Sequence, residues 1–183
     1  MRRTLLALVL PLGACATADV ADSDTLDKNA AYVSVFPIAS AGEIDVDRID
    51  LTLSCTDLVG TQYETYLPKL ATRRATIVKL RPSTCYVSKV KGLLSTQAGL
   101  VPAQTLFATK PNQLNFPGVW VFRFRLTHGL SVATPTQMST TLDFAINVTV
   151  QNAPAARTMI GEQFPKFTKL LPLEYTRAAE SPQ

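Results

Sequence analysis

The chain has 183 residues, which suits one domain with a substantial core, and it carries a formal net charge of +4. Hydrophobic residues make up 46% and charged residues 17% of the sequence, which excludes wholesale disorder, and 12 prolines with 8 glycines exclude a collagen-like or linker-dominated chain. One histidine and three cysteines leave too few soft ligands for an ordinary zinc site, so we expect no metal.

The first 14 residues have the order of an export signal. Arg2 and Arg3 form a basic region, an apolar run of eight residues follows at 5–12, and two small residues precede Cys15. The run is too short for a transmembrane helix, which needs about 20 apolar residues to cross a bilayer. Residues 1–14 are therefore predicted to be a signal peptide.

The end of this signal, Leu12-Gly13-Ala14-Cys15, resembles the bacterial lipobox. The resemblance implies that Cys15 is lipid-modified and becomes the first residue of a lipoprotein. It also implies sorting to the outer membrane, because Ala16 follows where an Asp would retain a lipoprotein in the inner membrane. The alternative is ordinary secretion after Ala14 or Ala18, with Cys15 incidental.

Residues 15–28 are predicted to be a lipid-anchored, flexible tether. Residues 16–28 contain four Asp, no aromatic residue and few branched apolar residues, a composition that does not support packing. The folded body is expected to begin at residue 29.

Cys55 and Cys85 form an even pair once Cys15 is assigned to the lipid. An exported protein folds in an oxidising compartment, where a disulfide is the default interpretation. In the chain-entropy model, closing a loop of about 30 residues stabilises a fold by about 3–4 kcal/mol. The competing interpretation is two buried or redox-active thiols, although the pair lacks a C-x-x-C spacing.

Apolar residues in the body recur mainly at every second position, which predicts β-strands. The alternation is clearest at 49–55, 120–126 and 142–151, where one face is apolar and the other polar, as in half-buried antiparallel strands. Four shorter candidates bring the number of predicted strands to about seven: 32–36, 76–80, 86–91 and 105–108.

The periodicity changes near the C-terminus. Asn152 can cap a helix, Pro154 suits a first turn, and helical spacing predicts a helix near 154–164 that Pro165 ends. Residues 174–183 show no pattern and are expected to be a frayed tail. The chain is therefore predicted to be mainly β, a single antiparallel β-sandwich of immunoglobulin-like or transthyretin-like architecture over residues 29–173.

Together, the lipobox, the sandwich strands, the Pro117-Gly118 turn before an aromatic strand and the late helix resemble small uncharacterised bacterial envelope lipoproteins with one β-sandwich domain. The resemblance covers most of the chain. It implies no activity, because a fold alone does not give a function.

Charge is distributed unevenly along the chain. Residues 19–64 hold ten acidic and two basic residues, whereas residues 65–183 hold fourteen basic and four acidic ones. Three pairs of basic residues, each spaced two apart, would form a basic sheet face for an anionic partner: Lys79, Arg81, Lys89, Lys91, Arg123 and Arg125. The alternative is that acidic residues on a neighbouring strand neutralise this face, namely Asp45, Asp47, Asp50 and Asp57.

The alternation also sets a condition on two of these residues. Cys85 and Val87 share parity with Lys89 and Lys91, so an inward disulfide would turn both lysines inward. Only a β-bulge, or a disulfide at the rim of the sheet, would let the lysines face solvent.

These observations predict a non-catalytic lipoprotein, anchored in the outer membrane and facing the periplasm, that acts as a binding or assembly module. No residue pattern resembles a catalytic motif, and no cofactor is expected. Its partners would be the membrane, through the lipid, and an envelope protein, lipopolysaccharide or peptidoglycan; nucleic acid is not expected there. The alternative is a periplasmic small-ligand or glycan binder, which an aromatic-lined concavity with exposed Trp120 or Phe122 would reveal.

Overall fold

The computed structural model describes residues 20–21, 24–92, 97–99, 105–134 and 137–176, and it describes only the backbone of residues 97–99, 125–134 and 137–145. The strands within these ranges are β1 (Ala31–Ala41), β2 (Ile44–Asp45), β3 (Arg48–Asp57), β4 (Gln62–Ala71), β5 (Thr76–Leu80), β6 (Ser83–Lys91), β7 (Gln97–Gly99), β8 (Phe107–Ala108), β9 (Leu114–Phe116), β10 (Val119–Thr134), β11 (Gln137–Gln151) and β12 (Leu173–Tyr175). The helices are α2 (Pro154–Gln163) and α3 (Pro165–Leu170).

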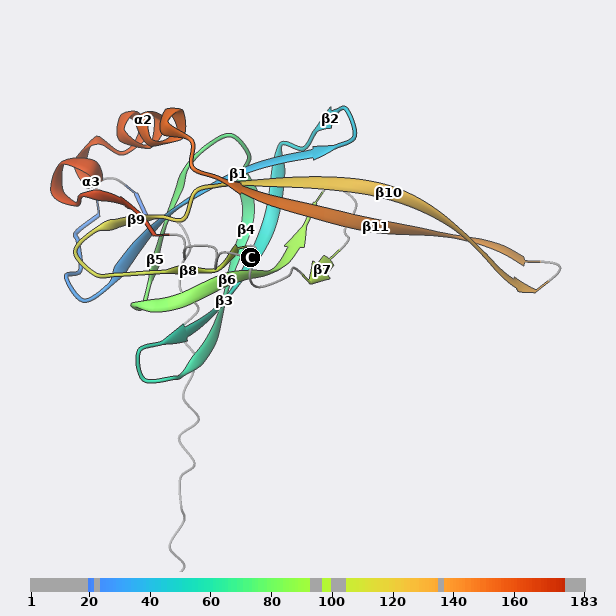
Figure 1. The fold of residues 1–183 in the computed structure, drawn as a ribbon, viewed down its shortest axis with the longest axis horizontal. Coiled ribbons are helices and arrows are strands. Elements are labelled where there is room, and N and C mark those ends of the chain that lie inside the picture. Colours follow the sequence, from blue (N-terminus) through green and yellow to red (C-terminus); the bar gives the residue numbers. More distant parts are fainter. Residues whose placement is uncertain (1–19, 22–23, 93–96, 100–104, 135–136, 177–183) are drawn as a thin grey trace, which may run out of the picture.

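The described strands form two sheets, so the chain is mainly β as expected (Figure 1). One sheet is antiparallel, in the order β4-β3-β6-β7, with β8 also paired to β6. The other is mixed and curls as a half-barrel, in the order β11-β10-β1-β9-β12, with β2 and β5 also paired to β1.

The mixed sheet departs from the expected topology. β1 pairs in parallel with β10 and β9, and β9 pairs in parallel with β12. The predicted sandwich is antiparallel, so the expectation is wrong for this sheet. The physical reason lies in the connections, because β9 and β10 return to β1 only after the chain has passed through the other sheet.

β1 is the central strand of the mixed sheet and is buried on both faces. Val33 and Val35 belong to a core that fills the space between the two sheets. Tyr32 and Phe36, at the alternate positions, belong to a second core that the helices cover. A strand with two buried faces shows no alternation between buried and exposed residues, and residues 31–36 are all buried, including the polar Ser34.

The helices pack on the face of the mixed sheet that is turned away from the antiparallel sheet (Figure 1). α2 buries Ile160 there and α3 buries Phe167, whose ring meets that of Tyr32 at a centroid distance of 5.3 Å. The molecule therefore has three layers: antiparallel sheet, mixed sheet and helices.

The C-terminal region confirms one predicted helix and adds a second. α2 matches the helix expected near 154–164, but its N-cap is Ala153, and no side chain caps it. Pro165 does not end the helical region; it begins α3, because proline suits the first turn of a helix.

The chain then adds β12, and the backbone N–H of Thr176 donates to the carbonyl of Phe116 at 3.0 Å. The folded body therefore extends past residue 173. Residues 177–183 of the predicted tail lie outside the described residues.

The body also begins earlier than residue 29. Val20 is buried in the second core, and its N–H donates to the carbonyl of Ile77 at 3.0 Å. The predicted signal peptide and Cys15 lie outside the described residues. Within the ranges described, no helix is both long and apolar enough to span a bilayer.

β10 and β11 extend past the body as a two-stranded ribbon, which we call the arm (Figure 1). β10 pairs with β1 as far as Phe124. Beyond that residue, its described pairing is with β11 alone and continues to Thr134, opposite Gln137.

Candidate functional site

A disulfide joins Cys55 to Cys85, as the sequence predicted. The two residues are directly opposite each other on β3 and β6, and both are buried in the core between the sheets. The disulfide therefore fixes the register of the two central strands of the antiparallel sheet.

β6 contains the bulge that Lys89 and Lys91 need in order to face solvent. Leu53 pairs with Val87, whereas Thr52, which precedes Leu53 in β3, pairs with Lys89. Ser88 is therefore an extra residue in β6. The extra residue shifts the alternation by one position. Val87 and Val90 are consequently both buried, while Lys89 is exposed on the outer face.

The six predicted basic residues do not share one face. The described structure places them on two sheets: Lys79 in β5, Arg81 just after β5, Lys89 and Lys91 in β6, and Arg123 with Arg125 in β10. The side chain of Arg125 lies outside the described residues.

Three of the six have acidic partners. The nitrogen–oxygen distances are 2.9 Å for Lys79–Asp27, 3.5 Å for Lys89–Glu64 and 4.0 Å for Arg81–Asp57. The hydrogen bond between Asp27 and Lys79 lowers the pKa of the carboxyl group and raises the pKa of the ammonium group. Neutralisation by neighbouring acids therefore applies to Lys79, Arg81 and Lys89, although only Asp57 was among the acids expected to provide it.

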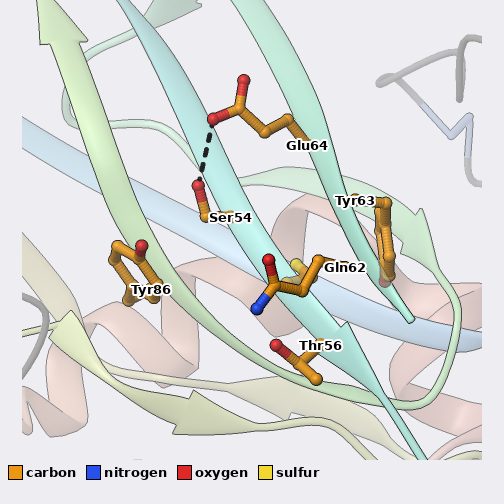
Figure 2. A pocket seen from close by; sticks show the side chains of 7 residues that line it. Ser54, Thr56, Gln62, Tyr63, Glu64 and Tyr86 are labelled. Carbon is orange, nitrogen blue, oxygen red and sulfur yellow. Dashed lines mark hydrogen bonds between the residues drawn. The ribbon is translucent and has the colours of Figure 1, made fainter. Parts of the chain in front are cut away.

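An open depression of about 470 Å³ lies on the antiparallel sheet (Figure 2). It is lined by seven residues from β3, β4 and β6: Ser54, Cys55, Thr56, Gln62, Tyr63, Glu64 and Tyr86. The register explains why the polar side chains gather there, because Ser54 is opposite both Glu64 and Tyr86. Paired residues project from the same face of a sheet.

The carboxylate of Glu64 is held in place at this surface. The hydroxyl of Ser54 donates to one carboxylate oxygen at 3.3 Å (Figure 2). Lys89 lies 3.5 Å from the other oxygen. The depression therefore presents a carboxylate of fixed position beside hydroxyl and amide groups.

Two tyrosines in this region have different roles. The hydroxyl of Tyr63 is hydrogen-bonded to that of Ser83 at 2.9 Å, and Tyr63 packs against the core between the sheets. Tyr66 is 53% exposed and lies two residues from Glu64, on the same face of β4.

Asp50 orients Tyr66. The tyrosine hydroxyl donates to one oxygen of Asp50 at 2.7 Å, while the other oxygen accepts the backbone N–H of Lys69 at 2.8 Å. The hydrogen bond from Tyr66 to Asp50 raises the pKa of the phenol. An exposed aromatic ring is thus held on the same face of the sheet as the depression, although Tyr66 does not line it.

Trp120 and Phe122, whose exposure would have indicated an aromatic-lined ligand pocket, do not line this depression. Trp120 and Phe122 are both 0% exposed and belong to the core between the sheets. In the part of the chain that the structure describes, no group of three or more His, Cys, Asp or Glu side chains is arranged to hold a metal ion.

Sequence reasoning missed Glu64 and Tyr66 because it did not identify β4. The outer residues Gln62, Glu64 and Tyr66 do alternate with inner ones, and that alternation was the available signal. The alternation stops at Pro68 and Lys69, where the strand bulges and Lys69 has a positive φ of 52°. Comparisons of the chain with protein-family models, with curated proteins and with solved structures found no match.

Proposed function

We propose that the protein is a non-catalytic, lipid-anchored binding module of the bacterial cell envelope, and that the outer face of its antiparallel sheet binds a hydroxyl-rich glycan. One observation carries the ligand class: a polar depression with a hydrogen-bonded carboxylate shares its face of the sheet with an exposed, oriented tyrosine. The proposed ligand surface differs from the one expected around Trp120.

The side chains of this surface match the chemistry of a sugar. Sugar hydroxyls both donate and accept hydrogen bonds, and so do the side chains of Ser54, Thr56 and Gln62. The apolar C–H face of a sugar ring can stack on the rings of Tyr66 and Tyr86. Because the bonds within the sheet already hold Glu64 and Tyr66, little side-chain freedom would be lost on binding.

The location rests mainly on the lipobox at residues 12–15, which implies lipidation of Cys15 and sorting to the outer membrane. The disulfide supports an oxidising compartment. Among the anions and polymers of such a compartment, peptidoglycan is the hydroxyl-rich glycan that a protein facing the periplasm would meet.

The test is co-sedimentation of the full chain with peptidoglycan sacculi, using Cys15→Ser so that no lipid contributes. Tyr66→Ala and Tyr86→Ala should each weaken binding about 3- to 10-fold through the lost ring contact. Tyr66→Phe is the matched control, because it keeps the ring and removes only the bond to Asp50, and it should weaken binding less than Tyr66→Ala does.

The same assay examines the basic residues. Binding could be sensitive to salt, unaffected in both tyrosine variants and lost in Arg123→Glu combined with Arg125→Glu. That result would contradict the glycan surface and favour electrostatic binding through Arg123 and Arg125. The protein would then hold an anionic partner, such as lipopolysaccharide or an acidic protein, through β10. Absence of binding to sacculi in every variant would contradict the proposed ligand.

A further inference from the structure

The turn between β3 and β4 presents two adjacent aliphatic side chains to solvent. Leu58 and Val59 are each 86% exposed, which makes them the most exposed large hydrophobic residues in the part of the chain that the structure describes. Single exposed apolar residues are common on protein surfaces, but two neighbours at the tip of a hairpin form an interaction surface.

The turn holds this pair in a fixed position. One carboxylate oxygen of Asp57 accepts the backbone N–H groups of Val59, at 3.1 Å, and of Thr61, at 2.8 Å. The N–H of Gly60 donates to the carbonyl of Asp57 at 3.0 Å, and Gly60 has a φ of +86°, which favours glycine. The aliphatic side chains are therefore presented by a tightly bonded turn.

Two basic side chains, Arg81 and Lys110, lie near the base of this tip, together with the acidic Asp57. Arg81 approaches Asp57 at 4.0 Å, and its side chain is 71% exposed. Lys110 is also exposed, and its neighbour Thr109 is hydrogen-bonded to Ser83 at the start of β6. An apolar tip with basic residues behind it matches a bilayer, where acyl chains lie below a layer of phosphates.

The N-terminal segment joins the body along β5, the strand that precedes Arg81. The N–H of Val20 donates to the carbonyl of Ile77 in the second core, on the other side of the mixed sheet from the turn, and Asp27 pairs with Lys79. Cys15 is five residues before Val20, so the chain between them spans at most about 18 Å. A lipid on Cys15 would therefore keep the body as a whole close to the bilayer.

We propose that Leu58 and Val59 insert into the boundary between the headgroups and acyl chains of a phospholipid bilayer, with Arg81 and Lys110 at the level of the phosphates. A bilayer fits this tip better than a protein pocket does, because it receives a small aliphatic wedge without needing a matched shape. The proposal rests on the proposed anchor only for the closeness of the membrane.

The test measures quenching of tryptophan fluorescence by brominated acyl chains. The full chain is coupled through Cys15 to a maleimide phospholipid in phosphatidylethanolamine–phosphatidylglycerol vesicles, with Cys55 and Cys85 oxidised. This coupling supplies an anchor whether or not the cell acylates Cys15. The experiment therefore tests insertion of Leu58 and Val59 separately from the proposed lipidation of Cys15. Trp120 is the sole tryptophan and is 0% exposed, so it provides a low background.

Leu58→Trp and Val59→Trp should each lose at least half of the added fluorescence on brominated vesicles. Ile44→Trp is the matched control, because Ile44 is also an exposed aliphatic residue, at 69%, but lies in β2 away from this turn; its fluorescence should be unchanged. Equal quenching at both places, or no quenching in either tip variant, would overturn the proposal.

Discussion

At the scale of single residues, Asp50 and Asp57 show how one carboxylate can fix an irregular backbone. Each accepts two hydrogen bonds, and each holds a position where the antiparallel sheet departs from regular pairing. Asp50 lies opposite the bulge of β4, and Asp57 closes the turn that follows β3. Both positions adjoin a surface to which we assign a function.

Asp50→Asn should lower the pKa of Tyr66 toward its ordinary value, because the hydrogen bond to the ionised Asp50 is what raises that pKa. Because the phenol of Tyr66 has a higher pKa in the folded than in the unfolded state, its hydrogen bond contributes fully to stability at pH values below the unfolded-state pKa. This contribution is lost as the pH rises through the folded-state pKa. The parent should therefore lose stability in that alkaline range more steeply than Asp50→Asn does. Ultraviolet titration of the phenolate, with Tyr66→Phe to assign the signal, checks the shift.

Replacing both cysteines of the disulfide should destabilise the fold by about 3–4 kcal/mol, since the bridge closes a loop across a separation of 30 residues. Cys55→Ser with Cys85→Ser can be compared with the parent by urea denaturation. Cys15→Ser is the control and should leave the midpoint unchanged. A loss below about 1 kcal/mol would mean that the unfolded state is already restricted in this region.

At the scale of elements, Gly118 and Gly161 should respond in opposite directions to alanine. Gly118 immediately precedes β10 and has a φ of +108°, and an added Cβ would lie 2.9 Å from Val150 and 3.0 Å from the carbonyl of Gln151. Gly118→Ala should therefore cost at least about 2 kcal/mol. Gly161 lies in α2 with open space around it, so Gly161→Ala should stabilise by about 0.5–1 kcal/mol. Thermal unfolding of both variants compares them directly.

The strands that the sequence predicted are those with one buried face. β3 alternates between buried and half-exposed residues along most of its length, and its residues 49–55 were predicted as a strand. β1 was predicted only over 32–36, because both of its faces are buried and no alternation continues beyond them. Its parallel partners could not be predicted from periodicity, which carries no information about strand direction.

Bulges decide which residues reach the candidate site. The extra residue at Ser88 moves Lys89 to the outer face, beside Glu64, which is the condition that the predicted basic face required, but nothing in the local sequence marks its position. The disulfide, by contrast, follows from counting cysteines, and it was predicted correctly. A disulfide can be predicted by counting cysteines without knowing the topology. The face on which a strand residue lies, by contrast, changes with every shift of the strand register before it.

At the scale of the whole molecule, the turn between β3 and β4 and the arm leave the body in different directions. The turn lies at the lower edge of the body in Figure 1, whereas the arm runs to the right. Ten residues of β10, 125–134, extend for about 33 Å at the usual rise of a strand.

The arm should be the least protected part of the sheet in hydrogen exchange. Its described pairing beyond Phe124 joins β10 to β11 alone, and an isolated two-stranded ribbon is marginally stable in water. Backbone amides of 126–134 and 137–144 should exchange at least about 100-fold faster than those of 119–124, which also pair with β1 or lie in the core. Exchange measured by NMR at two protein concentrations checks this. Slow exchange that becomes fast on dilution would instead show that a second copy covers the arm, and would make this ribbon the assembly surface of the molecule.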